Sequence, residues 1–123
     1  MIVTELELKE CVRFSRRLPE DRDLENIKRL VYVAQNGQLL IYKEQGKIKG
    51  YAELYRMNYI PSHPVEPLPI DNPDGEYLYC WAAVSEKGYL FKLIRMAKIT
   101  FKSCKFLIWH THKKNSKLHM EKI

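Results

Sequence analysis

The sequence lacks a paired cysteine framework, a long hydrophobic run and, in its last third, acidic residues. Its cysteines are odd in number and show no C-x-x-C spacing, so we expect buried thiols rather than a disulfide scaffold or zinc knuckle; they are Cys11, Cys80 and Cys104. No apolar run approaches the ~18 residues of a membrane span, and the polar start is unlike a signal peptide. We therefore expect a soluble, cytoplasmic protein without membrane association.

What is present indicates one domain over residues 1–123. Hydrophobic residues make up 46% of the 123 positions and charged residues 29%, which is typical of a globular chain. The sequence contains neither an internal repeat nor a low-complexity tract. A chain of this length has room for a single hydrophobic core.

Charge is distributed unevenly along the chain. Residues 1–86 hold 11 Lys or Arg against 14 Asp or Glu, whereas residues 87–123 hold 10 against Glu121 alone. Such segregation points to an anionic partner of the last third: a phosphorylated cofactor, a nucleic acid or an acidic protein surface. A basic face that serves only solubility is the alternative.

Hydrophobic periodicity predicts a mixed order of helices and strands. The expected elements are a short strand at 2–8, helices at 9–18 and 21–34, a hairpin with strands at 38–43 and 48–58, a strand at 76–84, a basic helix at 90–104, a strand at 105–111 and, after a turn at 115–116, a strand-like tail. Gly50 within a strand indicates a bulge or a close backbone approach. The strand–helix–strand unit requires parallel strands and a right-handed crossover.

This order, with the segments QLLIYKEQGKIKGYAEL and YLYCWAAVSEKGYLFKLIRMAKITFKSCKFLIWHT, resembles the GNAT (Gcn5-related N-acetyltransferase) superfamily over roughly residues 5–112. The resemblance implies an α+β fold in which a mixed, mostly antiparallel central sheet carries helices on both faces. It also implies an acyl-CoA cofactor, acetyl-CoA or another acyl-CoA, that lies between two parallel strands which part from each other.

The second segment would hold that cofactor. A helix N-terminus has unpaired amides and a partial positive charge, and a glycine in the turn before it lets backbone approach a phosphate. By resemblance, the exposed edge of the strand pairs with the pantetheine arm and the turn holds the pyrophosphate. The residues concerned are Trp81, Ala82, Ala83 and Val84 on the strand, and Ser85, Glu86, Lys87, Gly88, Tyr89 and Leu90 in the turn.

Two departures from the family pattern concern this loop and the end of the chain. Leu90 stands where the family has a second small residue, and Ser85 where it has Arg or Gln. After the strand at 105–111 only Thr111 to Ile123 remain, without the tyrosine that often protonates the leaving thiolate. A C-terminally shortened GNAT domain would take part of its sheet from another subunit, which predicts a homodimer.

Few side chains suggest chemistry by themselves. Glu76 is a candidate base but reads better as an exposed strand-end carboxylate, and Cys80 has no neighbouring histidine to activate it as a nucleophile. His110 and His112 share one strand face with His119 nearby in sequence, so a histidine base or a zinc site is conceivable. Basic neighbours and the absence of a ligand spacing argue against metal, and we assign no metal site and no catalytic residue.

The primary hypothesis is a divergent GNAT-fold acyltransferase that transfers an acyl group from acyl-CoA to an unidentified amine. The alternative is a non-catalytic GNAT-like binding or assembly protein, of phage origin, that contacts nucleic acid or an acidic partner through its basic last third. Aromatic residues could then stack on nucleobases. They are Tyr51, Tyr55, Tyr77, Tyr79, Trp81, Tyr89 and Trp109.

Overall fold

One five-stranded sheet organises the chain. The computed structural model describes residues 4–15, 23–62, 70–111 and 117–123. The elements are α1 (Glu5–Ser15), α2 (Asp23–Gln35), β1 (Leu39–Glu44), β2 (Lys47–Met57), β3 (Tyr77–Ser85), α3 (Leu90–Thr100), β4 (Phe106–His110) and β5 (Leu118–Lys122). The strands follow each other in the sheet in chain order.

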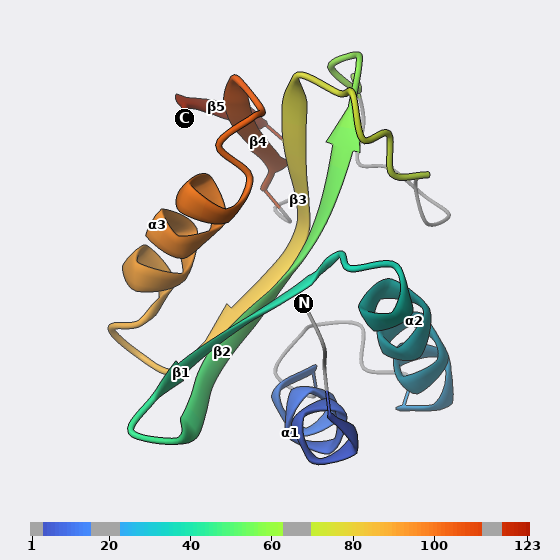
Figure 1. Cartoon of the computed structure of the whole chain (residues 1–123), viewed down its shortest axis with the longest axis vertical. Helices are drawn as coiled ribbons and strands as arrows, with labels where there is room; N and C mark the ends of the chain where they lie inside the picture. Colours follow the sequence, from blue (N-terminus) through green and yellow to red (C-terminus); the bar gives the residue numbers. More distant parts are fainter. Residues whose placement is uncertain (1–3, 16–22, 63–69, 112–116) are drawn as a thin grey trace.

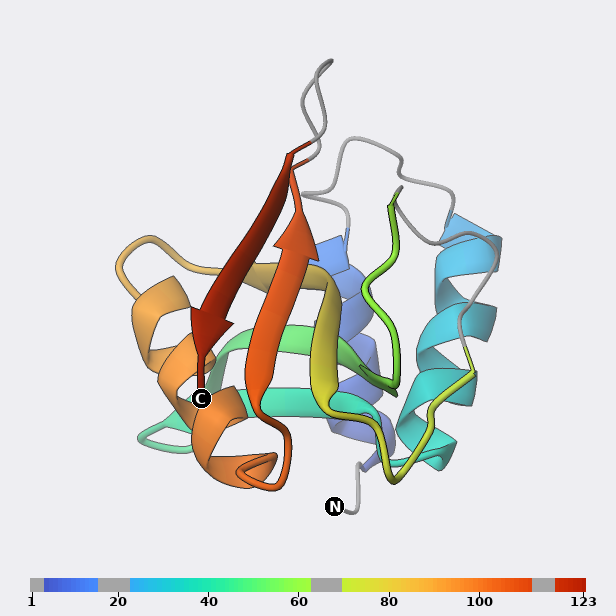
Figure 2. The ribbon, with the colours of Figure 1, turned by 90° about the horizontal axis from the view of Figure 1, so that it is seen from above.

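The sheet is mixed, and its single parallel pair is β3–β4. The pairs β1–β2, β2–β3 and β4–β5 are antiparallel, and α3 supplies the crossover between the parallel strands. Helices α1 and α2 cover one face of the sheet and α3 covers the other (Figures 1 and 2). The α+β class and the mostly antiparallel sheet expected from the sequence are therefore confirmed.

Each face of the sheet has its own hydrophobic cluster. On the α1/α2 face the buried residues are Cys11, Leu30, Val33, Leu39, Ile41, Tyr51, Tyr55, Met57, Tyr79, Val84 and Ile108. On the α3 face they are Leu40, Ala52, Leu54, Leu78, Leu93, Ala97, Cys104 and Leu107. Strands β2 and β3 contribute to both clusters, because successive side chains alternate between the faces.

Two expected boundaries are wrong. Residues 5–8 begin α1 instead of forming a strand, because Thr4 and Glu7 make a capping box: the Thr4 N–H donates to Glu7 Oε1 (2.9 Å) and the Glu7 N–H donates to Thr4 Oγ1 (3.2 Å). Helix α3 ends at Thr100, and Cys104 lies beyond it, where its N–H donates to the Phe101 carbonyl (3.0 Å). Residues 1–3, 16–18 and the expected turn at 115–116 lie outside the described ranges.

Gly50 serves both purposes that the sequence suggested. The β1–β2 register shifts directly after the Tyr42–Gly50 pair, which marks a bulge. A Cβ atom on Gly50 would lie 2.7 Å from Ser85 Cβ and 2.8 Å from the Val84 carbonyl oxygen, so β3 approaches closely as well. The hairpin therefore packs directly on the C-terminal end of β3.

The proline-rich connection between β2 and β3 is anchored where it returns to the sheet. Asp71 accepts hydrogen bonds from the backbone N–H of Arg56 (2.7 Å) and from its guanidinium (2.6 Å), and the Asn72 N–H donates to the Arg56 carbonyl (2.8 Å). Residues 63–69 lie outside the described ranges. Among the helices that the structure describes, none has the length and apolarity needed to cross a membrane.

Candidate functional site

The parallel strands β3 and β4 separate after three residue pairs. Tyr79 and Ile108 form the last pair, yet β3 runs on to Ser85 and β4 to His110. Figure 1 shows β3 continuing beside β2 beyond its contact with β4. The backbone groups of this part of β3 that face away from β2 therefore border an opening in the sheet, which we call the wedge.

A bulge lies where the wedge begins. Glu53 pairs with Ala82 but the next residue of β2, Leu54, pairs with Cys80, so Trp81 is the extra residue of β3. A bulge bends the strand that carries it and increases its local twist. The bend at the bulge therefore explains why β3 separates from β4 at this position.

The turn between β3 and α3 follows the end of β3 that lies farthest from its pairing with β4. Gly88 has a φ of +90°, a conformation that favours glycine. The turn is fastened to β2, because the Glu86 N–H donates to the Lys49 carbonyl (2.8 Å). The first turn of α3 has no acidic residue and no side-chain cap, so its free amides give the turn a partial positive charge.

Several side chains around the turn donate hydrogen bonds to one carboxylate. Glu44 accepts hydrogen bonds from Lys92 Nζ (3.1 Å), the Tyr42 hydroxyl (3.0 Å) and the Tyr89 hydroxyl (3.3 Å), and the bond from Lys92 is the largest cause that lowers the Glu44 pKa. Lys87 is exposed and makes no ion pair within the described part of the chain. Leu90 belongs to neither core cluster and is 46% exposed, so its side chain stays at the surface of the turn.

A hydrogen bond spans the narrow end of the wedge. The Tyr79 hydroxyl lies 2.8 Å from His110 Nδ1, and the ring centroids are 5.6 Å apart. Tyr79 is 2% exposed and His110 is 7% exposed. Because His110 lies two residues beyond the last β3–β4 pair, this bond links the two strands on the α1/α2 face just where they part.

A buried ion pair lies on the same face. Arg29 Nε donates to both carboxylate oxygens of the fully buried Glu53 (3.1 Å each), and the guanidinium lies 4.4 Å from the centre of the Trp81 ring. Burial raises the Glu53 pKa and the Arg29 charge opposes that shift. The pair thus connects α2 and β2 to the bulge in β3.

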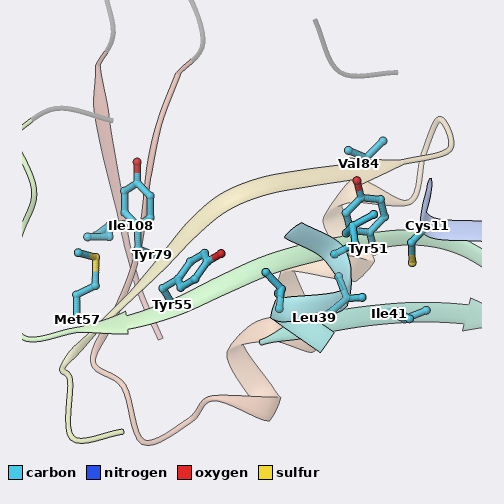
Figure 3. Close-up of a cluster of buried hydrophobic side chains, with 11 residues drawn as sticks. Cys11, Leu39, Ile41, Tyr51, Tyr55, Met57, Tyr79, Val84 and Ile108 are labelled. Atoms are coloured by element: carbon cyan, nitrogen blue, oxygen red, sulfur yellow. The ribbon is translucent and has the colours of Figure 1, made fainter. Parts of the chain in front are cut away.

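Two tyrosine hydroxyls flank this ion pair. Tyr51 and Tyr55 stand two residues to either side of Glu53 on β2, and both are fully buried (Figure 3). Neither hydroxyl has a hydrogen-bond partner among the residues that the structure describes. Desolvation is the first cause that raises both pKa values, and the Glu53 charge is the second.

Neither sequence candidate on β3 lies at the wedge as a reactive group. Glu76, just before β3, is exposed and pairs with Lys105 (3.1 Å), as expected of a strand-end carboxylate. Desolvation raises the pKa of the Cys80 thiol to about 12, and its Sγ donates to the Ala82 carbonyl (3.6 Å) on the α3 face. A thiol with this pKa is protonated near neutral pH, which opposes a nucleophilic role.

The histidines are divided between the two faces of the sheet. His110 faces α1/α2, whereas His119 on β5 stacks on Trp109 (5.2 Å between ring centroids) on the α3 face. His112 lies outside the described ranges. Within those ranges no three residues of the metal-binding types gather, and the geometry gives no support to a zinc site.

The basic last third is partly neutralised by the chain itself. Among its described lysines three form ion pairs, Lys92 with Glu44, Lys98 with Glu121 and Lys105 with Glu76. Lys87, Arg95 and Lys102 make no ion pair with the rest of the described chain. A cleft of about 820 Å³ lies between α1 and the β1–β2 hairpin, and Glu86 of the turn is part of its wall.

Comparison with known proteins identifies the architecture. The structure is similar to the GphF GNAT-like decarboxylase in complex with isobutyryl-CoA, with a TM-score of 0.61 and 12% identity over 94% of this chain; this chain spans 66% of that one. It is also similar to an acetyltransferase, with a TM-score of 0.52 and 14% identity over 90% of this chain and 79% of the other. No family model and no curated protein matches the sequence.

The chain therefore has the GNAT-like acyl-CoA fold, in a divergent form. The parted strands β3 and β4 and the turn before α3 correspond to the elements on which the sequence resemblance rested. Identities of 12% and 14% show the fold alone. The strand beside β4 is this chain's own β5, and a homodimer stays a prediction.

Sequence reasoning missed two polar pairs of the site. Tyr79 appeared only among the strand aromatics and His110 only in the H-x-H motif. Their contact depends on the parallel register, which spacing does not reveal. Glu53 between Tyr51 and Tyr55 carries a usable signal, because a carboxylate on a strand face lined with aromatics needs a buried cation as partner.

Proposed function

We propose that this chain binds acyl-CoA in the wedge and transfers the acyl group to an amine. The observation that carries the proposal is the end of β3–β4 pairing at Tyr79 and Ile108 while both strands continue. Buried or enclosed backbone groups need partners. A ligand that enters the opening can supply them by pairing with a strand edge.

The pantetheine arm suits the parted half of β3. Its two amides and its extended shape match the backbone groups of Trp81, Ala82, Ala83 and Val84 that face the opening. The similar decarboxylase, whose structure contains isobutyryl-CoA, supports this use of the fold. The acyl thioester would then lie at the narrow end of the wedge.

The pyrophosphate suits the turn from Ser85 to Leu90. The backbone at Gly88 and the uncapped start of α3 attract anions, and Lys87 adds an exposed cation. Glu86 and Tyr89 are held by the Lys49 carbonyl and by Glu44, so they shape the turn. Leu90 is the misfit, because it places an exposed apolar side chain at the start of α3 without contributing to either core cluster.

Titration of the purified chain with acetyl-CoA and isobutyryl-CoA by calorimetry tests the proposal. We expect Lys87→Glu to weaken binding about tenfold, and Lys102→Glu, the same charge change beyond the far end of α3, to leave it within about twofold, since exposed charges are screened over ~8 Å. Leu90→Ala should tighten binding without lowering Tm. No binding at millimolar acyl-CoA, or equal losses in both lysine variants, contradicts the wedge assignment.

Transfer is tested separately from binding. A panel of primary amines with acetyl-CoA, followed by release of free CoA thiol and by mass spectrometry of the amide, should identify an acceptor. Binding of acyl-CoA without transfer to any amine would support the proposed cofactor site and contradict the proposed acyltransferase activity.

A second candidate is polyanion binding by the outer side of α3. Phe91 is 70% exposed and Arg95 lies over its ring at 5.5 Å, and Arg95 makes no ion pair within the described residues. An exposed aromatic ring beside cations suits single-stranded nucleic acid. Arg95→Glu should then reduce the salt-dependent retention on DNA and leave acyl-CoA binding unchanged; no DNA retention by the unaltered chain rejects this candidate.

A further inference from the structure

A hydrogen bond between Tyr79 and His110 links β3 and β4 on the α1/α2 face at the narrow end of the wedge. Tyr79 belongs to the last β3–β4 pair and His110 lies two residues beyond it on β4, and the Tyr79 hydroxyl and His110 Nδ1 meet at 2.8 Å. In Figure 3 the Tyr79 hydroxyl points away from Tyr55 and along the β4–β5 hairpin. A reacting group held at the narrow end would lie beside this hydroxyl.

The carboxylates, the thiol and the second described histidine near the wedge make contacts elsewhere. Both oxygens of Glu53 accept from Arg29. Cys80 belongs to the α3 face, and Glu76 pairs with Lys105 at the other end of β3. His119 stacks on Trp109 on the α3 face. The Tyr79–His110 pair places an imidazole and a phenol hydroxyl at the narrow end of the wedge.

We infer that Tyr79 and His110 form a proton relay that carries one proton from the acceptor amine to the leaving thiolate. The inference rests on the proposed acyl transfer. It assigns both the base and the acid function to side chains of the two wedge strands. Tyr79 touches the reacting atoms, and His110 acts through Tyr79.

The relay balances in two steps. As the neutral amine attacks the thioester carbonyl, a C–N bond forms, the amine proton passes to the Tyr79 oxygen, and the Tyr79 hydroxyl proton passes to Nδ1 of neutral His110. When the C–S bond breaks, the thiolate takes a proton from the Tyr79 hydroxyl, and Nδ1–H returns its proton to the Tyr79 oxygen. The products are the amide and free CoA thiol, with both side chains restored.

Tyr79→Phe tests the relay, because it removes one buried oxygen and keeps the ring. With the full chain, acetyl-CoA and the best acceptor of the amine panel, kcat should fall roughly 10²–10⁴-fold, the usual contribution of positioned acid–base groups. The KM for acetyl-CoA and its calorimetric Kd should stay within about twofold. Tyr77→Phe is the matched control, since Tyr77 stands two residues earlier on the same face and stacks on Phe106.

His110→Asn tests the second member. The asparagine amide can still bond to Tyr79 but cannot store a proton at neutral pH, so kcat should fall while KM and Tm stay near their original values. The double variant should be no slower than the slower single variant, because groups that act as a unit are not additive.

The outcomes separate the two proposals. Full transfer by Tyr79→Phe overturns the relay and leaves the acyltransferase proposal standing. Equal losses in Tyr77→Phe and Tyr79→Phe overturn the relay as well, because they show a packing effect. An unaltered chain that binds acyl-CoA but transfers to no amine overturns the relay together with acyl transfer.

Discussion

The two faces of the sheet are built from the same strands but from different chemistry. On the α3 face, β2 and β3 present apolar side chains such as Leu54 and Leu78 to Leu93 and Ala97. On the α1/α2 face the same strands present Glu53 and tyrosines, and α2 adds Arg29. The α3 face therefore holds the sheet together, and the α1/α2 face carries buried polar groups right up to the wedge.

The largest effect should come from breaking the ion pair on the polar face. Glu53→Leu leaves the Arg29 guanidinium without its carboxylate and should lower the free energy of unfolding by about 3–5 kcal/mol. Replacing both residues, as Arg29→Met with Glu53→Leu, should restore most of it. Urea denaturation of the three proteins provides the measurement. If the double variant is no more stable than Glu53→Leu, the uncompensated Arg29 charge is not the cause of the lost stability.

The apolar face should respond through lost packing instead. Leu54 is the chain neighbour of Glu53, faces α3 and is 1% exposed. Leu54→Ala should cost about 3 kcal/mol through transfer and cavity terms. In contrast to Glu53→Leu, no second substitution that removes a charge should restore the stability of Leu54→Ala. The affinity of the folded fraction for acyl-CoA should not change.

Gly50 tests how closely the hairpin supports the wedge turn. Gly50→Ala places a Cβ 2.8 Å from the Val84 carbonyl oxygen and should cost about 1–3 kcal/mol, as overpacking does. Gly46→Ala is the control: its site is open and only its φ of +77° opposes a side chain, so it should cost about 1 kcal/mol. Thermal unfolding ranks the two, and the reverse order would contradict the close approach.

The smallest effect distinguishes partnered from unpartnered hydroxyls on the polar face. Tyr55→Phe removes a buried hydroxyl that has no partner in the described part of the chain, so stability should be unchanged or higher by up to about 1 kcal/mol. Tyr79→Phe removes the partner of His110 and should cost about 1 kcal/mol. Chemical denaturation of both should separate them. A loss of 2 kcal/mol or more in Tyr55→Phe would indicate a bound water that completes the site.

The sequence predicts the elements better than their relations. Alternating β-branched and aromatic residues predict β1 to β4. Gly50 within a strand predicts both the bulge and the close approach of β3. The start of α1 was predictable too, because Thr4-x-x-Glu7 is a capping box, but the apolar alternation over residues 2–8 favoured a strand. Local signals of this kind need no partner elsewhere in the chain.

The candidate site depends on long-range geometry. Periodicity does not reveal where two parallel strands stop pairing, so the wedge was expected from the family resemblance alone. Arg29 and Glu53 are 24 residues apart, and Tyr79 and His110 are 31 apart, on elements whose relative position only the fold determines. The residues were visible in the sequence, and their pairing was not.

The opening between β3 and β4 has a thermodynamic consequence for any ligand that fills it. Strand-edge amides without a protein partner are hydrated in the empty state, so an incoming chain exchanges water for its own carbonyls, and each such exchange gains only about 1 kcal/mol. Affinity along the strand edge is therefore modest per contact. The apolar linker atoms of the ligand and its charged end must supply the remainder, which makes the heat capacity change and the salt dependence of association the informative quantities.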